Sequence, residues 1–410
     1  MNAPRVHRLS NGFAIVADPM AGVETIAVGL YVDCGARHEE ARTNGLAHLF
    51  EHMVFKGAGG RSAREISEAV ENVGGYLNAF TSRDQTAFQA RMLADDLALG
   101  VELIADLVRR PHFDEGDLGR EKDVVLQELG EARDQPDDII NDHFHATAWP
   151  AQAFGRPVLG DGATIAAIGV DDLRGWTARH YRPQAMVLAC SGKVDFDALV
   201  EIAEKHFGDM PQAPRPVAEL ATYQGGTFVE KRRLESAHIL FGYQGISYFD
   251  PDYYPLMLFS QAAGEGSSSR LFQAVREDRG LAYSIGSSVS AWRDTGLLTV
   301  YLATATREAK RATDLARDIL RGTAIDLTQA ELDRAKAQIR ATILMALESV
   351  QGRADRLGFQ TLVHGAPVDA AVIVAKIDAC TLDQVRAVGA RMLSGHETLA
   401  TVGPALKAAA

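Results

Sequence analysis

The sequence is poor in the residues that mark several classes of protein. It contains only three cysteines, Cys34, Cys190 and Cys380, an odd number at distant positions. This spacing excludes a disulfide framework and a compact cysteine-rich metal motif. No stretch approaches the roughly 18 consecutive apolar residues of a membrane-spanning helix, and the first residues include no apolar run of signal-peptide length. We therefore expect a cytoplasmic protein with no membrane partner.

Positive charge is also scarce. The chain has 42 Lys and Arg against 54 Asp and Glu, a formal net charge of −12. A nucleic-acid partner would require a basic face, so we expect none, and the acidic balance mildly favours basic substrates. The 47% apolar content is sufficient for a sizeable core, and 410 residues exceed what one core usually serves. At least two domains are predicted.

The first third predicts an alternation of strands and helices. Asn44 is a plausible N-cap for the helix that follows it, and Gly74-Gly75 ends a later helix. Strands are expected at 13–17 and 25–32, which we interpret as a hairpin, and at 76–82 and 85–92 as a second pair; helices are expected at 64–73, 94–109 and 114–134.

The second half repeats this plan faintly but in the same order. Ala69-Val70-Glu71 with Gly75 corresponds to Ala274-Val275-Arg276 with Gly280, each a helix end followed by glycine and a strand. A duplicated α+β domain is the simplest explanation. We expect two homologous domains, each an antiparallel-rich mixed sheet covered by helices, at 1–209 and 218–410, with the proline-rich segment 210–217 as linker.

The stretch His48-Leu49-Phe50-Glu51-His52 predicts a metal site. Histidines four residues apart project from the same face of a helix, and Glu51 lies beside the second. The pattern His-x-x-Glu-His reverses the commoner His-Glu-x-x-His of zinc peptidases and itself occurs in zinc enzymes. One short motif also fits an ordinary helix with a solvated glutamate, so a third ligand is needed.

The expected helix from Asp114 supplies two candidates for that ligand. Glu121 and Glu128 are seven residues apart and therefore lie on nearly the same side of the helix. Apolar residues such as Leu118, Val125 and Leu129 share that side. Carboxylates are rarely buried without a cation, and a metal ion would supply one. A solvated helix face is the alternative.

Three segments together resemble the pitrilysin and insulinase zinc metallopeptidases, especially the short bacterial members and the catalytic subunit of the mitochondrial processing peptidase. These segments are 48–57, 74–81 and 121–128. The resemblance extends over essentially the whole chain. It implies one Zn²⁺ per chain, held by His48, His52 and Glu128, with Glu51 as general base and Glu121 as a second acidic residue that steadies the site.

The resemblance also implies how substrate is bound. An arginine and tyrosine pair of the family matches Arg276 and Tyr283 of the second domain, which would clamp the peptide and stabilise the oxyanion. An extended substrate would add to the edge strand that contains Asn78, Ala79 and Phe80. Members of this length usually form a chamber from two chains. Because this chain has both the zinc motif and the arginine and tyrosine pair, a homodimer that hydrolyses peptides or unfolded polypeptide segments is the simpler expectation, and a heterodimer with a paralogue is the alternative.

Two alternatives remain open at this stage. The chain is either a zinc endopeptidase or, like some relatives of the family, a catalytically silent structural or partner subunit. The complete set that the resemblance implies favours the enzyme: His48, Glu51, His52, Glu128, Arg276 and Tyr283. The acidic run 134–142 either attracts basic peptides or forms a solvated helix cap, and the second interpretation is the more economical one.

Overall fold

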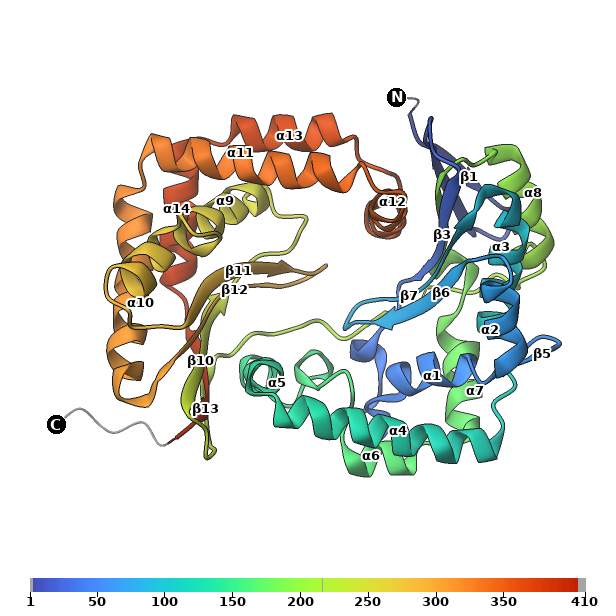
Figure 1. Cartoon of the computed structure of the whole chain (residues 1–410), viewed down its shortest axis with the longest axis horizontal. Coiled ribbons are helices and arrows are strands. Elements are labelled where there is room, and N and C mark those ends of the chain that lie inside the picture. The colour runs from blue at the N-terminus through green and yellow to red at the C-terminus, as the bar shows by residue number, and fades with distance from the viewer. Residues whose placement is uncertain (1–2, 216, 405–410) are drawn as a thin grey trace. The chain divides into compact units, whose positions relative to one another are not determined.

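The structure is a computed structural model that describes residues 3–215 and 217–404. The chain forms two compact units. The first comprises residues up to 129, 156–219 and 345–368, and the second comprises 130–155, 220–344 and 369 onwards. Each unit is a sheet covered by helices (Figure 1). The sequence-predicted fold class, two α+β domains with mixed sheets, is confirmed.

The first unit contains a sheet with the strand order β1-β2-β8-β3-β7-β6. β2 pairs in parallel with β8, and the other neighbours are antiparallel. The strands are β1 (Arg5–Arg8), β2 (Ala14–Pro19), β3 (Thr25–Val32), β6 (Tyr76–Thr81), β7 (Thr86–Leu93) and β8 (Met186–Gly192), with a small ribbon of β4 (Gly57–Ala58) and β5 (Arg61–Ser62). The helices are α1 (Leu46–Val54), α2 (Ala63–Glu71), α3 (Leu97–Arg109), α4 (Glu115–Asp134), α6 (Gly162–Ala167), α7 (Val170–His180), α8 (Phe196–Phe207) and α12 (Val350–His364). The last turn of α4, from Gly130, is assigned to the second unit.

The expected hairpin between the strands at 13–17 and 25–32 is wrong, because β8 lies between β2 and β3. Every residue of β8 is buried. A continuous apolar strand of this kind requires a central position that is covered on both faces. The chain between Pro19 and Thr25 is long enough to span the extra strand, whereas β6 and β7 form the predicted antiparallel pair.

The second unit repeats the strand arrangement of the first. Its order is β9-β13-β10-β12-β11, which matches β2-β8-β3-β7-β6 position by position, and its β9 and β13 are likewise parallel. The strands are β9 (Gly226–Lys231), β10 (Ser236–Gln244), β11 (Ser284–Ala291), β12 (Gly296–Ala305) and β13 (Glu397–Gly403). The helices are α5 (Pro136–Ala148), α9 (Tyr253–Gly264), the π-helix η6 (Phe272–Glu277), α10 (Ala309–Asp326), α11 (Gln329–Ala346), α13 (Ala370–Ala379) and α14 (Leu382–Leu393).

Each half of the sequence gives one helix to the sheet of the other half. α12, late in the chain, packs on β2, β3 and β8, and α5, early in the chain, packs on β9, β10 and β13 (Figure 1). Leu357 and Leu362 of α12 are buried against Val16 and Tyr31. The sequence prediction gave contiguous domains at 1–209 and 218–410. In the structure, residues 130–155 belong to the second unit and residues 345–368 to the first.

The expected linker lies in a region without regular structure. The described residues of 211–225 form no helix or strand, and residue 216 of the predicted linker 210–217 lies outside the described residues. No helix among the described residues has the length and apolar character needed to cross a lipid bilayer.

Candidate metal centre

Helix α1 presents both histidines of the motif on one side. Leu46, Leu49, Phe50 and Met53 are buried in the core of the first unit. The periodicity of the helix places His48, Glu51 and His52 on its other side, where they are half-buried. The sequence-predicted helix and its two-histidine face are therefore present.

The start of α1 differs from the sequence prediction. The N-cap is Gly45, whose φ of +94° is left-handed, and not Asn44. The Asn44 side chain instead donates a hydrogen bond to Glu39 at 2.8 Å. Glu39 is buried and accepts the Gly45 N–H at 2.9 Å and the Ala47 N–H at 2.7 Å. It thus satisfies backbone donors that a helix N-terminus leaves unpaired.

Glu39 lies in a dry environment for a carboxyl group. Burial raises its pKa to about 7, although the hydrogen bonds from Ala47, Asn44 and Gly45 oppose the rise. Since a helix N-terminus carries partial positive charge, the carboxylate is electrostatically matched to this position. The segment before α1 therefore fixes the helix that carries the motif.

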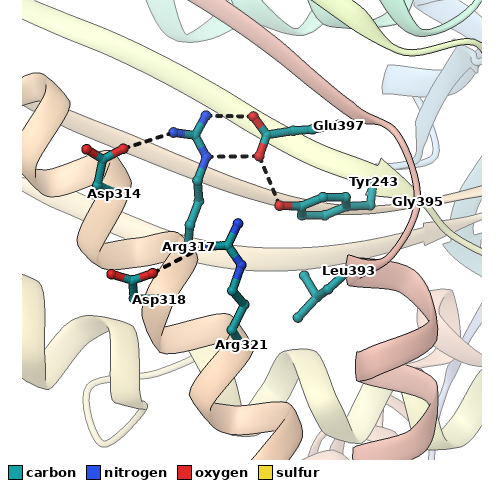
Figure 2. A pocket seen from close by; sticks show the side chains of 8 residues that line it. All are labelled: Tyr243, Asp314, Arg317, Asp318, Arg321, Leu393, Gly395 and Glu397. Atoms are coloured by element: carbon teal, nitrogen blue, oxygen red, sulfur yellow. Dashed lines mark hydrogen bonds and ion pairs between the residues drawn. The ribbon is translucent and has the colours of Figure 1, made fainter.

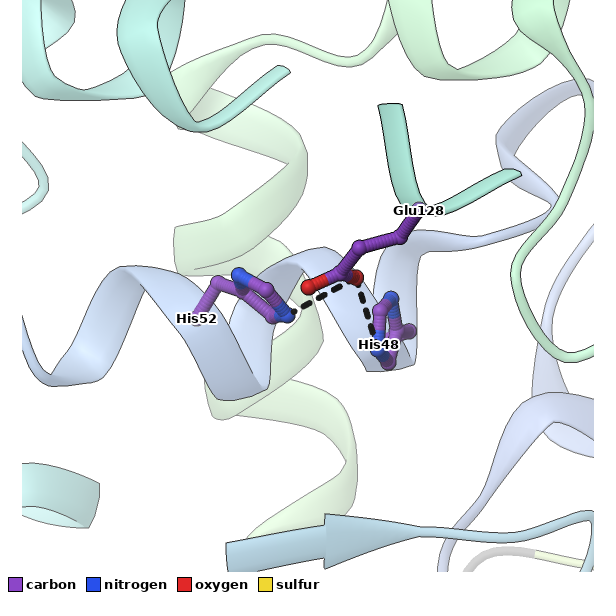
Figure 3. A group of neighbouring side chains, drawn as sticks. All are labelled: His48, His52 and Glu128. Carbon is purple, nitrogen blue, oxygen red and sulfur yellow. Dashed lines mark ion pairs between the residues drawn. The ribbon is translucent and has the colours of Figure 1, made fainter. Parts of the chain in front are cut away.

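The third member of the cluster comes from α4. The Oε2 atom of Glu128 lies 3.8 Å from Nε2 of His48 and 3.5 Å from Nε2 of His52. Figure 3 shows the three side chains pointing toward one another. One ligand atom of each lies within 4.8 Å of the others, and no other such group of three His, Cys, Asp or Glu occurs in the part of the chain that the structure describes.

Glu121 contacts the cluster from behind His52. Its Oε2 lies 3.2 Å from Nδ1 of His52, and its Oε1 forms an ion pair with Lys56 Nζ at 2.7 Å. Glu121 is buried at 6% exposure, whereas the Glu128 side chain is 40% exposed. A carboxylate on Nδ1 favours the tautomer whose Nε2 is free to bind a metal. Glu128 thus lies near Nε2 of both histidines, whereas Glu121 contacts Nδ1 of His52.

The His48 side chain is largely shielded from solvent, at 14% exposure. Burial and the neighbouring His52 lower its pKa to about 4, so the imidazole is neutral at physiological pH. Its Nδ1 is buried without a hydrogen-bond partner among the described residues. Neutral imidazole nitrogens and one carboxylate are the donors that zinc accepts in tetrahedral sites with an open position. The residues present fit that ion.

Glu51 lies on the same side of α1 and points toward strand β6. Burial raises its pKa above the ordinary value for glutamate, and the hydrogen bond from Thr81 opposes the rise. The Thr81 hydroxyl donates to Glu51 Oε2 at 2.5 Å. A carboxyl group with a raised pKa is chemically suited to accept a proton. The role of Glu51 as general base stays a prediction.

The predicted substrate-binding residues lie on β6, the edge strand of the first sheet. Ala79 is buried, and Phe80 is 38% exposed. Asn78 is exposed and donates a hydrogen bond to the Tyr76 hydroxyl at 3.0 Å. An edge strand leaves backbone groups available for pairing with an extended peptide.

Arg276 and Tyr283 lie in the second unit. Arg276 is in the π-helix η6, with its guanidinium 4.8 Å from the centre of the Phe272 ring. Tyr283 directly precedes β11 and is 66% exposed. Their predicted roles toward the residues of the first unit stay predictions.

A pocket in the second unit is polar but internally paired. Glu397 of β13 binds Arg317 of α10 through two hydrogen bonds of 2.9 and 2.6 Å, and accepts one from Tyr243 at 2.9 Å (Figure 2). Arg317 also reaches Asp314 at 3.2 Å. These contacts tie α10 to the sheet and explain the charges without a ligand.

Sequence reasoning missed three residues of the site. Glu39 accepts hydrogen bonds at the start of α1, Lys56 pairs with Glu121, and Thr81 donates a hydrogen bond to Glu51. Lys56 and Thr81 lie within the segments that carried the family resemblance, but their partners are distant in sequence. The only signal for Glu39 in the sequence was a glutamate a few residues before an expected helix.

Comparison with known proteins identifies the family of the chain. The model of the insulinase family, peptidase family M16, matches residues 15–162, and that of the peptidase M16 inactive domain matches residues 167–339. A relative named uncharacterized zinc protease from Rickettsia bellii is 32% identical over 97% of both chains. The mitochondrial-processing peptidase subunit beta of Lentinula edodes is 33% identical over 95% of this chain and 87% of that protein.

Solved structures share the fold. A structure from Pseudomonas fluorescens described as a peptidase M16 inactive domain has a TM-score of 0.91 at 20% identity, and covers 100% of this chain and 99% of that one. A protease from Helicobacter pylori has a TM-score of 0.90 at 22% identity, with 98% and 99% coverage. The resemblance inferred from the sequence is confirmed, and the chain belongs to the insulinase family of peptidases, family M16.

Proposed function

We propose that this chain is a zinc-dependent endopeptidase that hydrolyses peptides or unfolded segments of proteins. The observation that carries the proposal is the cluster of His48, His52 and Glu128 with Glu51 beside it. The names of the relatives support it, since several are called zinc proteases. One zinc ion per chain is proposed, because the described residues contain one such cluster.

The roles of the residues follow from their positions. His48, His52 and Glu128 would hold the zinc ion, and Glu121 would orient His52 through Nδ1. Bound zinc supplies Lewis-acid polarisation of the scissile carbonyl and lowers the pKa of water. Glu51 would accept the proton of the attacking water and pass it to the leaving amine.

Residues outside the cluster would bind the substrate. An extended peptide would pair with the exposed edge of β6 near Asn78, Ala79 and Phe80. Arg276 would bind a substrate carbonyl, and Tyr283 would donate a hydrogen bond to the oxyanion. We further propose a homodimer that encloses a chamber, and a preference for basic peptides consistent with the net charge of −12.

A catalytically silent subunit is the second candidate. The match of residues 167–339 to a domain described as inactive favours it superficially. That match covers neither the motif of α1 nor Glu128, which lie within the segment 15–162. The intact ligand set and base therefore favour the enzyme.

The test is hydrolysis of a quenched, unstructured basic peptide by the purified chain. We expect the chain to cleave the peptide, a chelator to abolish cleavage, and added zinc to restore it. The Glu51→Gln variant should bind zinc but not cleave the peptide. Light scattering would measure the oligomeric state in parallel. Stoichiometric zinc without cleavage of basic, neutral or acidic peptides would reject the enzyme in favour of the silent subunit.

A further inference from the structure

Thr81 is the last residue of the edge strand β6 and faces α1. Its hydroxyl lies 2.5 Å from Oε2 of Glu51 and 3.5 Å from the carbonyl oxygen of Ala47. The shorter contact has the length of a charge-assisted hydrogen bond to a carboxylate. One oxygen of the proposed general base is thus fixed by a residue of the neighbouring strand.

The turn that follows Thr81 is held in place from two sides. Ser82 N–H donates to the Gln85 carbonyl at 2.8 Å, which closes the turn between β6 and β7. The Ser82 carbonyl accepts the Ala36 N–H at 3.0 Å, and the Arg83 carbonyl accepts the Arg37 N–H at 3.0 Å. Thr81 is therefore anchored by backbone contacts that do not depend on Glu51.

The segment that anchors this turn also fixes α1. Residues Ala36 and Arg37 bind the turn, and Glu39, two residues further on, caps the N-terminus of α1. Arg37 additionally pairs with Asp84 of the turn at 3.0 Å. Residues 36–39 thus hold both the turn after Thr81 and the start of the helix that carries Glu51.

We infer that Thr81 is a positioning residue for Glu51: its hydroxyl holds one carboxylate oxygen, so that the carboxyl group keeps a single orientation toward the proposed metal centre. This inference rests on the proposed function, because it assigns the orientation of that function's base. The β-branched side chain is stiff about χ1, which makes threonine suited to this role.

The contact also joins two parts of the site. β6 is both the proposed docking edge for an extended peptide and the strand that holds the base. A peptide that pairs with β6 restrains the strand from its open side, so substrate binding and base orientation share one structural element. Reacting groups that are fixed before the chemical step contribute strongly to rate.

The test combines kinetics with zinc binding in Thr81→Val, which removes the hydroxyl and keeps the branched shape. We expect kcat to fall about 10- to 100-fold, as is typical for removal of an orienting hydrogen bond near a metal site. KM and the zinc dissociation constant are expected to stay within about threefold of the wild type, since neither ground-state binding nor the ligands are altered. Thr81→Ser should restore most of kcat.

Thr177→Val is the matched control, because it removes a threonine hydroxyl of α7 that donates to the Leu173 carbonyl at 3.1 Å. It should leave kcat near that of the wild type. Wild-type kcat in Thr81→Val would overturn the inference. Equal losses of zinc affinity and thermal stability in Thr81→Val and Thr81→Ser would replace it with a purely structural role.

A second measurement is independent of activity. Unfolding of the zinc-free protein is compared for Thr81→Val, Glu51→Ala and the double variant. We expect Thr81→Val to shift the unfolding midpoint in the wild-type background but not in Glu51→Ala. Equal shifts in both backgrounds would show that the two side chains do not interact and would overturn the inference. If the zinc-loaded wild-type protein did not cleave peptides, in contrast, the proposed function itself would be rejected.

Discussion

The Nδ1 atom of His52 lies 3.2 Å from a carboxylate oxygen of Glu121, whose other oxygen lies 2.7 Å from Lys56 Nζ. The imidazole is thereby held with its Nε2 toward Glu128, 3.5 Å away. A carboxylate behind a histidine fixes the tautomer and raises the basicity of the ligand nitrogen. Lys56 supplies the positive charge that a buried carboxylate requires.

Replacing Glu121 should therefore weaken metal binding although Glu121 itself is not one of the proposed ligands. For Glu121→Gln we expect the zinc dissociation constant to rise about 10- to 100-fold, because the neutral amide is a poorer acceptor and leaves Lys56 without its counter-charge. Competition with a chromogenic chelator measures the constant. Glu131→Gln, at an exposed position of the same helix, is the control. Equal affinities in the two variants would contradict the predicted role.

Gly45 permits the close approach of α1 to its surroundings. Its φ of +94° is unfavourable for residues with a side chain. An added Cβ would lie 2.5 Å from Ile165 Cδ1 and 2.8 Å from the Leu159 carbonyl oxygen. We expect Gly45→Ala to lower the free energy of unfolding by about 1–3 kcal/mol and to weaken zinc binding, since α1 carries both histidines.

The control for this substitution is Gly119→Ala in α4. A Cβ at Gly119 meets no described side chain within 4 Å, and alanine is favoured over glycine inside a helix by roughly 0.5–1 kcal/mol. Denaturant unfolding should therefore show opposite signs for the two variants. A neutral or stabilising Gly45→Ala would mean that the helix start is not constrained as described.

The parts of the site that were predictable from the sequence are those set by helical periodicity. His48 and His52, four apart, and Glu121 and Glu128, seven apart, lie on common faces of α1 and α4 as their spacing requires. The pair of strands β6 and β7 was predictable too, because only a short turn separates them. In each case the interacting residues are near one another in the chain.

The features that were not predictable depend on contacts between distant segments. Strand β8 enters the sheet between β2 and β3 although more than 150 residues separate it from them. Glu39 and Thr81 act on residues to which no repeat or motif links them. The exchange of α5 and α12 is of the same kind, since an amphipathic helix does not specify which sheet it covers.

Gly358 reports on the packing of α12 against the first sheet. A Cβ at this position would collide with the ring of Tyr31 on β3, whose hydroxyl donates to Asp355 of the same helix at 2.5 Å. Because the ring is buried, it has little room to move. We expect Gly358→Ala to destabilise the protein by about 1–3 kcal/mol, measured by denaturant unfolding.

Gly322→Ala is the matched control for α12. Gly322 lies in helix α10, and an added Cβ there meets no described atom within 4 Å. It should be neutral or slightly stabilising. If Gly358→Ala behaved in the same way, α12 would not be packed on β3 as the structure has it, and the assignment of residues 345–368 to the first unit would be wrong.

The lowered pKa of His180 should make the stability of the protein depend on pH. Its ring lies 4.2 Å from the ring of Trp176, and burial, with the nearby His38, lowers its pKa to about 3. In the unfolded chain a histidine has a pKa near ~6.5. Between these values the unfolded state binds more protons than the folded state. The stabilising contribution is therefore complete above about pH 6.5 and is lost progressively as the pH falls toward about 3.

His180→Phe removes this titration and keeps an aromatic ring beside Trp176. We expect the variant to gain about 1–2 kcal/mol relative to the wild type on going from about pH 7.5 to about pH 5, measured by denaturant unfolding of zinc-free protein. Glu39, with its pKa raised to about 7, contributes in the opposite direction, because its raised pKa makes folding less favourable as the pH rises. That contribution is common to both proteins and cancels. A difference between variant and wild type that is the same at both pH values would show that His180 is not held neutral by its burial.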